Sequence, residues 1–173
     1  MDGPRQPPAE GSGRDADPAS ISPRERLAAA YRATRYHVCD SPLGPFLIRC
    51  GERSPEVAAL LTDEPVGQWA FVTAENPGSV PLGRAANAER MRQLRAAVEA
   101  LGFRHYPGRG EGIGGDWPAE ASLLILGIPE AEAVALGRQF AQLAILTGSR
   151  HEPARLVWLD SPGYGVASGG AGA

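Results

Sequence analysis

The sequence contains no lysine, and all 17 of its basic residues are arginine. Without a lysine amine, the chain has no residue for Schiff-base chemistry or for the lysine of a P-loop, so both kinds of site are excluded. The arginines nearly balance 20 acidic residues, which leaves a formal net charge of −3. Because a dedicated nucleic-acid domain usually has a clear basic excess, we do not expect a nucleic-acid partner.

Cysteine and histidine are also scarce. Cys39 and Cys50 are too few for the disulfide framework of a small secreted domain, so we expect two free, buried thiols. His37, His105 and His151 are scattered along the chain and lack paired ligand spacing, so there is no zinc signature. We therefore predict neither a metal nor a cofactor.

Long apolar segments are missing as well. The longest uninterrupted run, at 123–129, is far below the roughly 18 residues that a membrane span requires. No apolar segment follows Met1 in the way that a signal peptide would require. The sequence therefore predicts a cytoplasmic protein without membrane contact.

The middle of the chain has the composition of a folded domain, whereas the two ends do not. Residues 1–21 and 161–173 hold almost no large apolar side chains, so burial there cannot offset an ordering entropy of about 1–2 kcal/mol per residue. We predict that both are disordered tails. A chain of 173 residues with 43% apolar content suits one domain, which we place at residues 22–160.

Local patterns predict the helices and strands. Ser22 and Glu25 form an S-x-x-E capping box with Pro23 at the first helical position, which predicts a helix over 23–35. Strands are expected at 36–39 and 45–50, and a short helix begins at Ser54. The chain then alternates between strands and helices: a strand at 69–73, a helix at 84–101, strands at 103–106 and 121–127, a helix from Pro129, and strands at 143–147 and 155–159.

This order predicts an α+β fold. Two βαβ halves joined by a loop form a ferredoxin-like split βαβ core over about 69–147, extended by the other strands and helices. Right-handed crossovers would place both helices on one face of an antiparallel sheet. The alternative is an α/β three-layer sandwich with a doubly wound parallel sheet, since buried apolar strands such as 69–73 also occur there.

The stretch Thr-Ala-Glu-Asn-Pro at 73–77, followed by a helical Asn87, belongs to a wider similarity. Further similar segments are Ala30-Tyr31, Trp117-Pro118, Gly137-Arg138 and Leu156-Val157-Trp158. From about residue 27 to 160 the chain resembles a bacterial family of domains of unknown function, the one numbered 3293. Gly83 departs from the capping serine expected there, which weakens that helix start by about a few tenths of a kcal/mol. The resemblance supports the domain limits and implies no activity.

The main candidate site follows the strand at 69–73. Thr73, Asn76 and Ser79 come directly after it, and Asn87 and Arg90 share one face of the next helix. In layered α/β structures, ligands collect beyond strand C-termini and at helix N-termini, where unpaired N–H groups favour anions. We predict that the loop and helix start at 73–90 bind a small polar or anionic ligand.

The same residues also have a purely structural interpretation. Asn76-Pro77-Gly78 is ordinary turn chemistry, because asparagine bonds its own backbone and glycine accepts a positive φ. In that case Asn87 serves only to fasten the loop.

Two further polar residues belong to the candidate site. Glu120 precedes the strand at 121–127 and forms a second wall if that strand neighbours 69–73; a carboxylate there can act as a general base if burial raises its pKa. Gln142 lies between a helix and a buried strand. The structural alternatives are a solvated acid at a strand edge and an amide that satisfies backbone groups.

A glycine-rich segment at 108–116 matches G-x-G-x-x-G at 110, 112 and 115. A dinucleotide site requires a helix immediately after this motif, whereas Trp117-Pro118 and another strand follow here. We therefore expect a flexible connecting loop, which can also act as a lid carrying Arg109, Glu111 and Asp116.

Two functional hypotheses of different classes follow. The first is a domain that binds a small polar or anionic ligand. The second is a protein-interaction or regulatory module that pairs through a sheet edge, because an edge strand is a template for pairing. A homodimer is one form that this pairing can take. Whether the protein is an enzyme stays open, since catalysis would require Glu120 or a histidine with a perturbed pKa in the same cavity.

Overall fold

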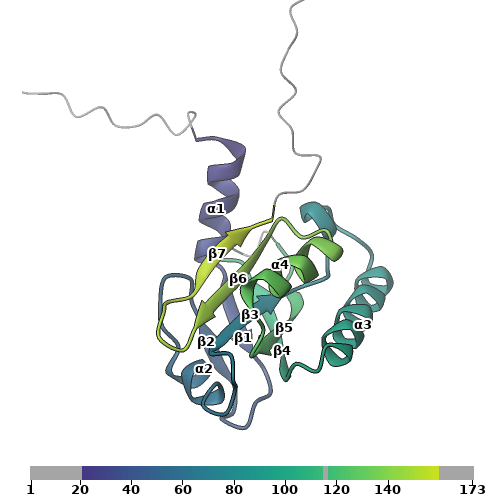
Figure 1. Cartoon of the computed structure of the whole chain (residues 1–173). Coiled ribbons are helices and arrows are strands. Elements are labelled where there is room, and N and C mark those ends of the chain that lie inside the picture. Colours follow the sequence, from purple (N-terminus) through teal and green to yellow (C-terminus); the bar gives the residue numbers. More distant parts are fainter. Residues whose placement is uncertain (1–20, 115–116, 160–173) are drawn as a thin grey trace, which may run out of the picture.

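Figure 1 shows a computed structural model, which describes residues 21–114 and 117–159. The tails predicted at 1–21 and 161–173 lie outside these residues, except for Ile21. The described helices are α1 (Pro23–Ala33), α2 (Pro55–Leu60), α3 (Arg84–Ala100) and α4 (Glu130–Gln139), with a 3-10 turn, η2 (Pro77–Ser79). None of these described helices is both long and apolar enough to cross a membrane.

The strands form one curled sheet of seven in the order β2-β1-β4-β5-β3-β6-β7. They are β1 (Arg35–Val38), β2 (Phe46–Ile48), β3 (Gln68–Val72), β4 (His105–Glu111), β5 (Glu120–Leu126), β6 (Ala144–Ser149) and β7 (Arg155–Trp158). All neighbouring pairs are antiparallel. The mixed helix and strand content agrees with the α+β prediction, whereas the parallel doubly wound alternative is wrong for the described sheet.

The inner strand β3 lies between two layers of the apolar core. Successive side chains of a strand point to opposite faces, so Ala70 and Val72 face one layer while Trp69 and Phe71 face the other. The first layer contains buried residues of both α3 and α4, including Leu94 and Leu136. The second contains Val57 and Leu60 of α2. Helix α1 lies on this second face, where the Tyr31 ring contacts Trp158 edge to face at 6.0 Å.

Helix α1 has a well-formed start and little burial. The predicted capping box is present: Glu25 N donates to Ser22 Oγ at 3.2 Å, and Ser22 N donates to Glu25 Oε2 at 2.8 Å. Ala28 is the buried residue of this helix. The N-terminal part of α1 extends past the sheet in Figure 1. Since packing usually supplies most of a helix's stability, α1 depends on its cap and on the few contacts of its last turns.

The glycine-rich segment differs from its prediction. We expected a loop over 108–116, but β4 runs through His105–Glu111, and residues 115–116, with Asp116, lie outside the described residues. A Cβ on Gly108 would lie 2.6 Å from the His37 carbonyl oxygen and 2.7 Å from Cζ of Phe71. Glycine therefore allows the Phe71 ring to lie directly against this strand.

The two cysteines are free, as expected. Cys50 is half-buried, whereas Cys39 is exposed. The expectation that both thiols are buried is therefore wrong for Cys39, because β1 ends at Val38 and the chain turns into solvent there.

Candidate functional site

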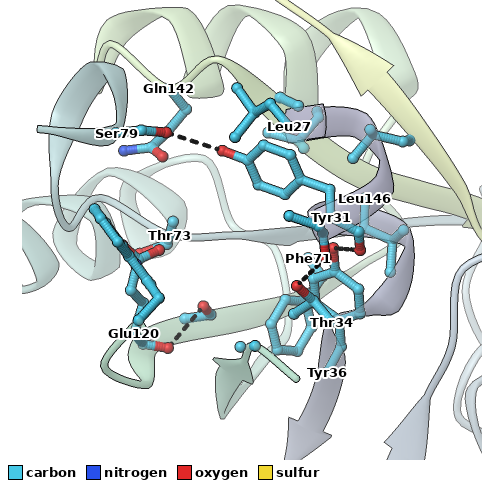
Figure 2. Close-up of a pocket in the computed structure, with 18 of the residues that line it drawn as sticks. Leu27, Tyr31, Thr34, Tyr36, Phe71, Thr73, Ser79, Glu120, Gln142 and Leu146 are labelled. Atoms are coloured by element: carbon cyan, nitrogen blue, oxygen red, sulfur yellow. Dashed lines mark hydrogen bonds between the residues drawn. The ribbon is translucent and has the colours of Figure 1, made fainter. Parts of the chain in front are cut away.

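A cavity of about 320 Å³ lies between α1 and the second face of the sheet. Leu27, Ala30 and Tyr31 of α1 form one wall, and Phe71 and Leu146 of the sheet form the opposite wall. Figure 2 shows the Tyr31 ring on one side of this cavity and Thr73, Glu120 and Gln142 on the other. The cavity therefore has an apolar body and a polar side.

The sheet order explains why the polar residues meet. Strand β3 runs antiparallel to β5 on one side and to β6 on the other. The end of β3 therefore lies beside the beginnings of both neighbours. This geometry brings together five of the residues singled out in the sequence, all of which line the cavity: Thr73, Asn76, Ser79, Glu120 and Gln142.

Asn87 and Arg90 lie behind the loop, and neither lines the cavity. Asn87 is 9% exposed; it accepts from Asn76 N at 3.1 Å and donates from Nδ2 to Asn76 Oδ1 at 2.9 Å. Arg90 donates from Nε to Ala74 O at 2.6 Å and from Nη2 to Phe140 O at 2.5 Å. Both side chains hold the loop in place from its inner side.

Asn76 adopts a left-handed conformation, with φ 46° and ψ 60°, which asparagine tolerates better than most residues. Its Oδ1 accepts from Asn87 Nδ2 and from Leu82 N, the latter at 2.9 Å. Two donors on Oδ1 fix the orientation of the amide, so Nδ2 points to Glu120, where it donates to Oε1 at 2.7 Å.

Glu120 is held by two donors on a single oxygen. Trp117 Nε1 donates to the same Oε1 at 2.8 Å as Asn76 Nδ2 does at 2.7 Å. Its other oxygen, Oε2, has no hydrogen-bond partner among the described residues. Asn87, Asn76 and Glu120 thus form a chain of hydrogen bonds that orients a carboxylate in the cavity wall.

Thr73 and Glu75 fasten the loop to the start of β5. Thr73 Oγ1 donates to Ala121 O at 2.7 Å, and Ala121 N donates to Glu75 Oε2 at 3.1 Å. Burial raises the pKa of Glu75 above its usual value, the hydrogen bond from Ala121 opposes this shift, and the charge of Glu120 adds to it. Glu75 was not predicted as a site residue, because its position in the sequence indicates only a turn.

Gln142 is 4% exposed and presents one acceptor to the cavity. Its Nε2 donates to Glu75 O at 3.0 Å and to Phe140 O at 3.4 Å. Because Nε2 faces two carbonyl oxygens, the reversed amide orientation would place Oε1 against acceptors and is excluded. Oε1 has no donor among the described residues.

Sequence reasoning missed the aromatic walls of the cavity. Tyr31 shares a helix face with Leu27 and Ala30, a pattern that indicates a core-facing stripe, and Trp117 reads as part of a turn. The Tyr31 hydroxyl lies 3.5 Å from Ser79 Oγ. Burial raises the pKa of Tyr31, the hydrogen bond with Ser79 opposes the shift, and the charge of Glu120 adds to it. The hydroxyl therefore keeps its proton at neutral pH.

Histidine does not contribute to this site. None of His37, His105 and His151 is among the cavity-lining residues. His37 Nε2 instead lies 3.1 Å from Glu111 Oε2 at the neighbouring strand, and His105 Nε2 lies 3.8 Å from Glu99 Oε1. Of the acid–base groups considered from the sequence, Glu120 is the one that the structure places in the cavity wall.

Comparison with known proteins finds one family similarity, in the central part of the chain. No curated protein and no solved structure matches the chain. Residues 72–145 match the model of the family described as "Protein of unknown function (DUF3293)". This segment runs from the last residue of β3 into β6 and includes the whole polar side of the cavity. The match supports a DUF3293 family domain over these residues.

Proposed function

We propose that this domain binds a small organic molecule in the cavity between α1 and the sheet. Ligand sites are typically concave, largely apolar and about 300–1,000 Å³ in volume, with a few fixed polar groups. The cavity of about 320 Å³ has apolar walls and two oriented polar side chains, Glu120 and Gln142. The single observation that carries the proposal is an accessible carboxylate held by Asn76 and Trp117 inside this cavity.

The central strands support a ferredoxin-like interpretation of the scaffold. Strands β4, β5, β3 and β6 are adjacent in that order and antiparallel, which is the arrangement that two interlocked βαβ units produce. Buried residues of α3 and α4 pack on the same face of these strands. In this scheme the cavity occupies the opposite face, which α1 covers.

A pair of substitutions on α1 tests the proposal. Ala30 and Ala29 are both exposed and adjacent, but only Ala30 lines the cavity. Ala30→Trp should fill the space, whereas Ala29→Trp adds the same side chain outside it. We expect a general fragment library, screened by thermal shift, to yield compounds that stabilise the wild type and Ala29→Trp but not Ala30→Trp. Equal stabilisation of both variants, or no stabilising compound at all, would overturn the proposal.

A second candidate function rests on the edge strand β7. This strand pairs with β6 and is the last in the described sheet, so its outer backbone groups have no strand partner there. Such an edge can pair with a second copy of the chain or with another protein. Sedimentation velocity over a wide concentration range tests this candidate. Because Leu159 N donates to Leu143 O, the alternating amides of Leu156 and Trp158 face outward. A species larger than a monomer in which these two amides become protected from hydrogen exchange would support it, and a monomer throughout would exclude self-pairing.

A further inference from the structure

The charge of the cavity wall is of one sign. Glu120 is the single charged side chain among its described lining residues, and no arginine or histidine is included. Arg90, which the sequence suggested as an anion-binding residue, directs its guanidinium to the carbonyl oxygens of Ala74 and Phe140. An anion in the cavity would meet a carboxylate and no compensating cation, which is unfavourable in a partly desolvated site.

Two open polar atoms of the wall are acceptors, beside one spare hydroxyl proton of the Tyr31–Ser79 pair. Glu120 Oε2 and Gln142 Oε1 both lack a donor among the described residues, while the donors of Asn76 and Gln142 are already bonded to protein oxygens. Gln142 Oε1 is not a buried atom, so it is open to a donor that a bound molecule presents in the cavity. The wall is therefore complementary to a ligand rich in hydrogen-bond donors.

Four aromatic side chains contribute to the cavity wall. Tyr31, Tyr36, Phe71 and Trp117 all line the cavity, and aromatic faces attract organic cations. The chain already uses this interaction on its surface, where the guanidinium carbon of Arg24 lies 5.0 Å from the ring centroid of Trp158. An aromatic or aliphatic body fits the same rings through apolar contact.

We propose that the ligand is an organic amine, protonated at neutral pH, on an aromatic or aliphatic body. Its ammonium group pairs with Glu120, a second donor binds Gln142 Oε1, and its body lies between Tyr31 and Phe71. This inference rests on the proposed function and names the ligand class of the same cavity. It also replaces the anion expected from the sequence, since the arginine needed for one is engaged elsewhere.

Three probes of similar shape and different charge test the ligand class: tyramine, 3-(4-hydroxyphenyl)propanoate and 3-(4-hydroxyphenyl)propan-1-ol. Each is titrated into ¹⁵N-labelled protein, and the indole N–H signal of Trp117, assigned with Trp117→Phe, reports on the cavity because this group donates to Glu120. We expect tyramine to bind the wild type at least about tenfold more tightly than the carboxylate probe, a difference of about 1.4 kcal/mol.

Two variants show whether the charge of Glu120 sets this preference. Glu120→Gln keeps an oxygen for Asn76 and Trp117 and removes the charge, so tyramine should lose its advantage over the alcohol. Glu111→Gln removes a carboxylate that does not line the cavity and should leave the preference unchanged. Retention of the tyramine preference in Glu120→Gln would overturn the proposal.

The outcomes separate this inference from the proposed function. If the carboxylate or the alcohol binds the wild type as well as tyramine does, and Ala30→Trp abolishes that binding, the cavity is a ligand site and the amine class is wrong. If tyramine does not bind the wild type, the amine class is again wrong, and the fragment screen still decides the function.

Discussion

Asn76 Nδ2 donates a 2.7 Å hydrogen bond to Glu120 Oε1 and so joins the loop after β3 to the first residue of β5. Behind this bond, Asn87 binds both the backbone N–H and the side-chain oxygen of Asn76. A residue on α3 that does not line the cavity thus determines the direction of a carboxylate that does. A residue behind a cavity wall can in this way fix the orientation of the side chain that faces the cavity.

Removing the Asn87 side chain should destabilise the whole domain. Asn87→Ala leaves the buried Asn76 N–H without its acceptor, and such a loss costs about 1–3 kcal/mol. Gln93→Ala is a matched control, because Gln93 is an exposed amide on the same helix and should change stability by less than about 0.5 kcal/mol. Urea denaturation measures both; equal effects would show that the Asn87–Asn76 bonds are not important to the fold.

Two glycines of β4 should respond very differently to alanine. A Cβ at Gly108 would overlap the Phe71 ring and the His37 carbonyl, whereas the nearest atom to a Cβ at Gly110 is Thr34 Cγ2 at 3.6 Å. Overpacking of a core costs about 1–3 kcal/mol. We expect Gly108→Ala to lose at least that much stability and Gly110→Ala to lose much less. Thermal unfolding compares the two, and a Gly108→Ala variant as stable as wild type would contradict the packing described for Phe71.

The raised pKa of Glu75 makes its contribution to stability depend on pH. Burial favours the protonated carboxyl in the folded state, so the fold binds this proton more tightly than the unfolded chain does. Ionisation therefore reduces stability as the pH rises from the ordinary value of 4.5 through the higher folded value. Glu75→Gln keeps an oxygen for Ala121 N–H and cannot ionise.

The free energy of unfolding of Glu75→Gln, relative to wild type, should consequently increase between about pH 4 and pH 7. Urea titrations at several pH values measure this difference. A difference that stays constant, or decreases over the interval, would show that burial does not raise the pKa of this group.

Helix α1 should open separately from the rest of the domain. Ala28 is its buried residue, and Ser22→Ala removes a cap worth about 1 kcal/mol. Amide hydrogen exchange should therefore become several-fold faster in α1 and stay unchanged in β3 and β5. Equal acceleration in the central strands would mean that α1 unfolds only with the whole domain. Because α1 forms one wall of the cavity, a bound ligand should slow exchange in α1.

The order of elements could be predicted from the sequence because the apolar patterns are strong. The continuous run at 69–73 and the amphipathic helix at 84–101 correspond to β3 and α3 within a few residues. The strand at 108–111 could not be predicted, since Gly108 and Gly110, with Pro107 just before them, indicate a loop. Its pairing with β1 and β5 depends on distant segments, and Gly108 is required by the ring of Phe71, which lies across the sheet.

The location of the candidate site followed from chain order, whereas its inner surface did not. Polar residues after β3 meet Glu120 and Gln142 because β3 lies between β5 and β6. Single-sequence patterns do not specify the direction of each side chain, which at Asn76 and Ser79 follows a positive φ. This is why Arg90 appeared to be a ligand-binding residue, while Tyr31 and Trp117 were overlooked as cavity walls.

The most direct test of the ligand site is the location of bound tyramine. Intermolecular NOEs between its aromatic protons and ¹³C-labelled methyl groups report which leucines it contacts. We predict NOEs to Leu27, Leu146 and Leu156, which line the cavity, and their loss in Ala30→Trp. NOEs confined to exposed leucines such as Leu43 and Leu101, unchanged in that variant, would contradict binding in the cavity.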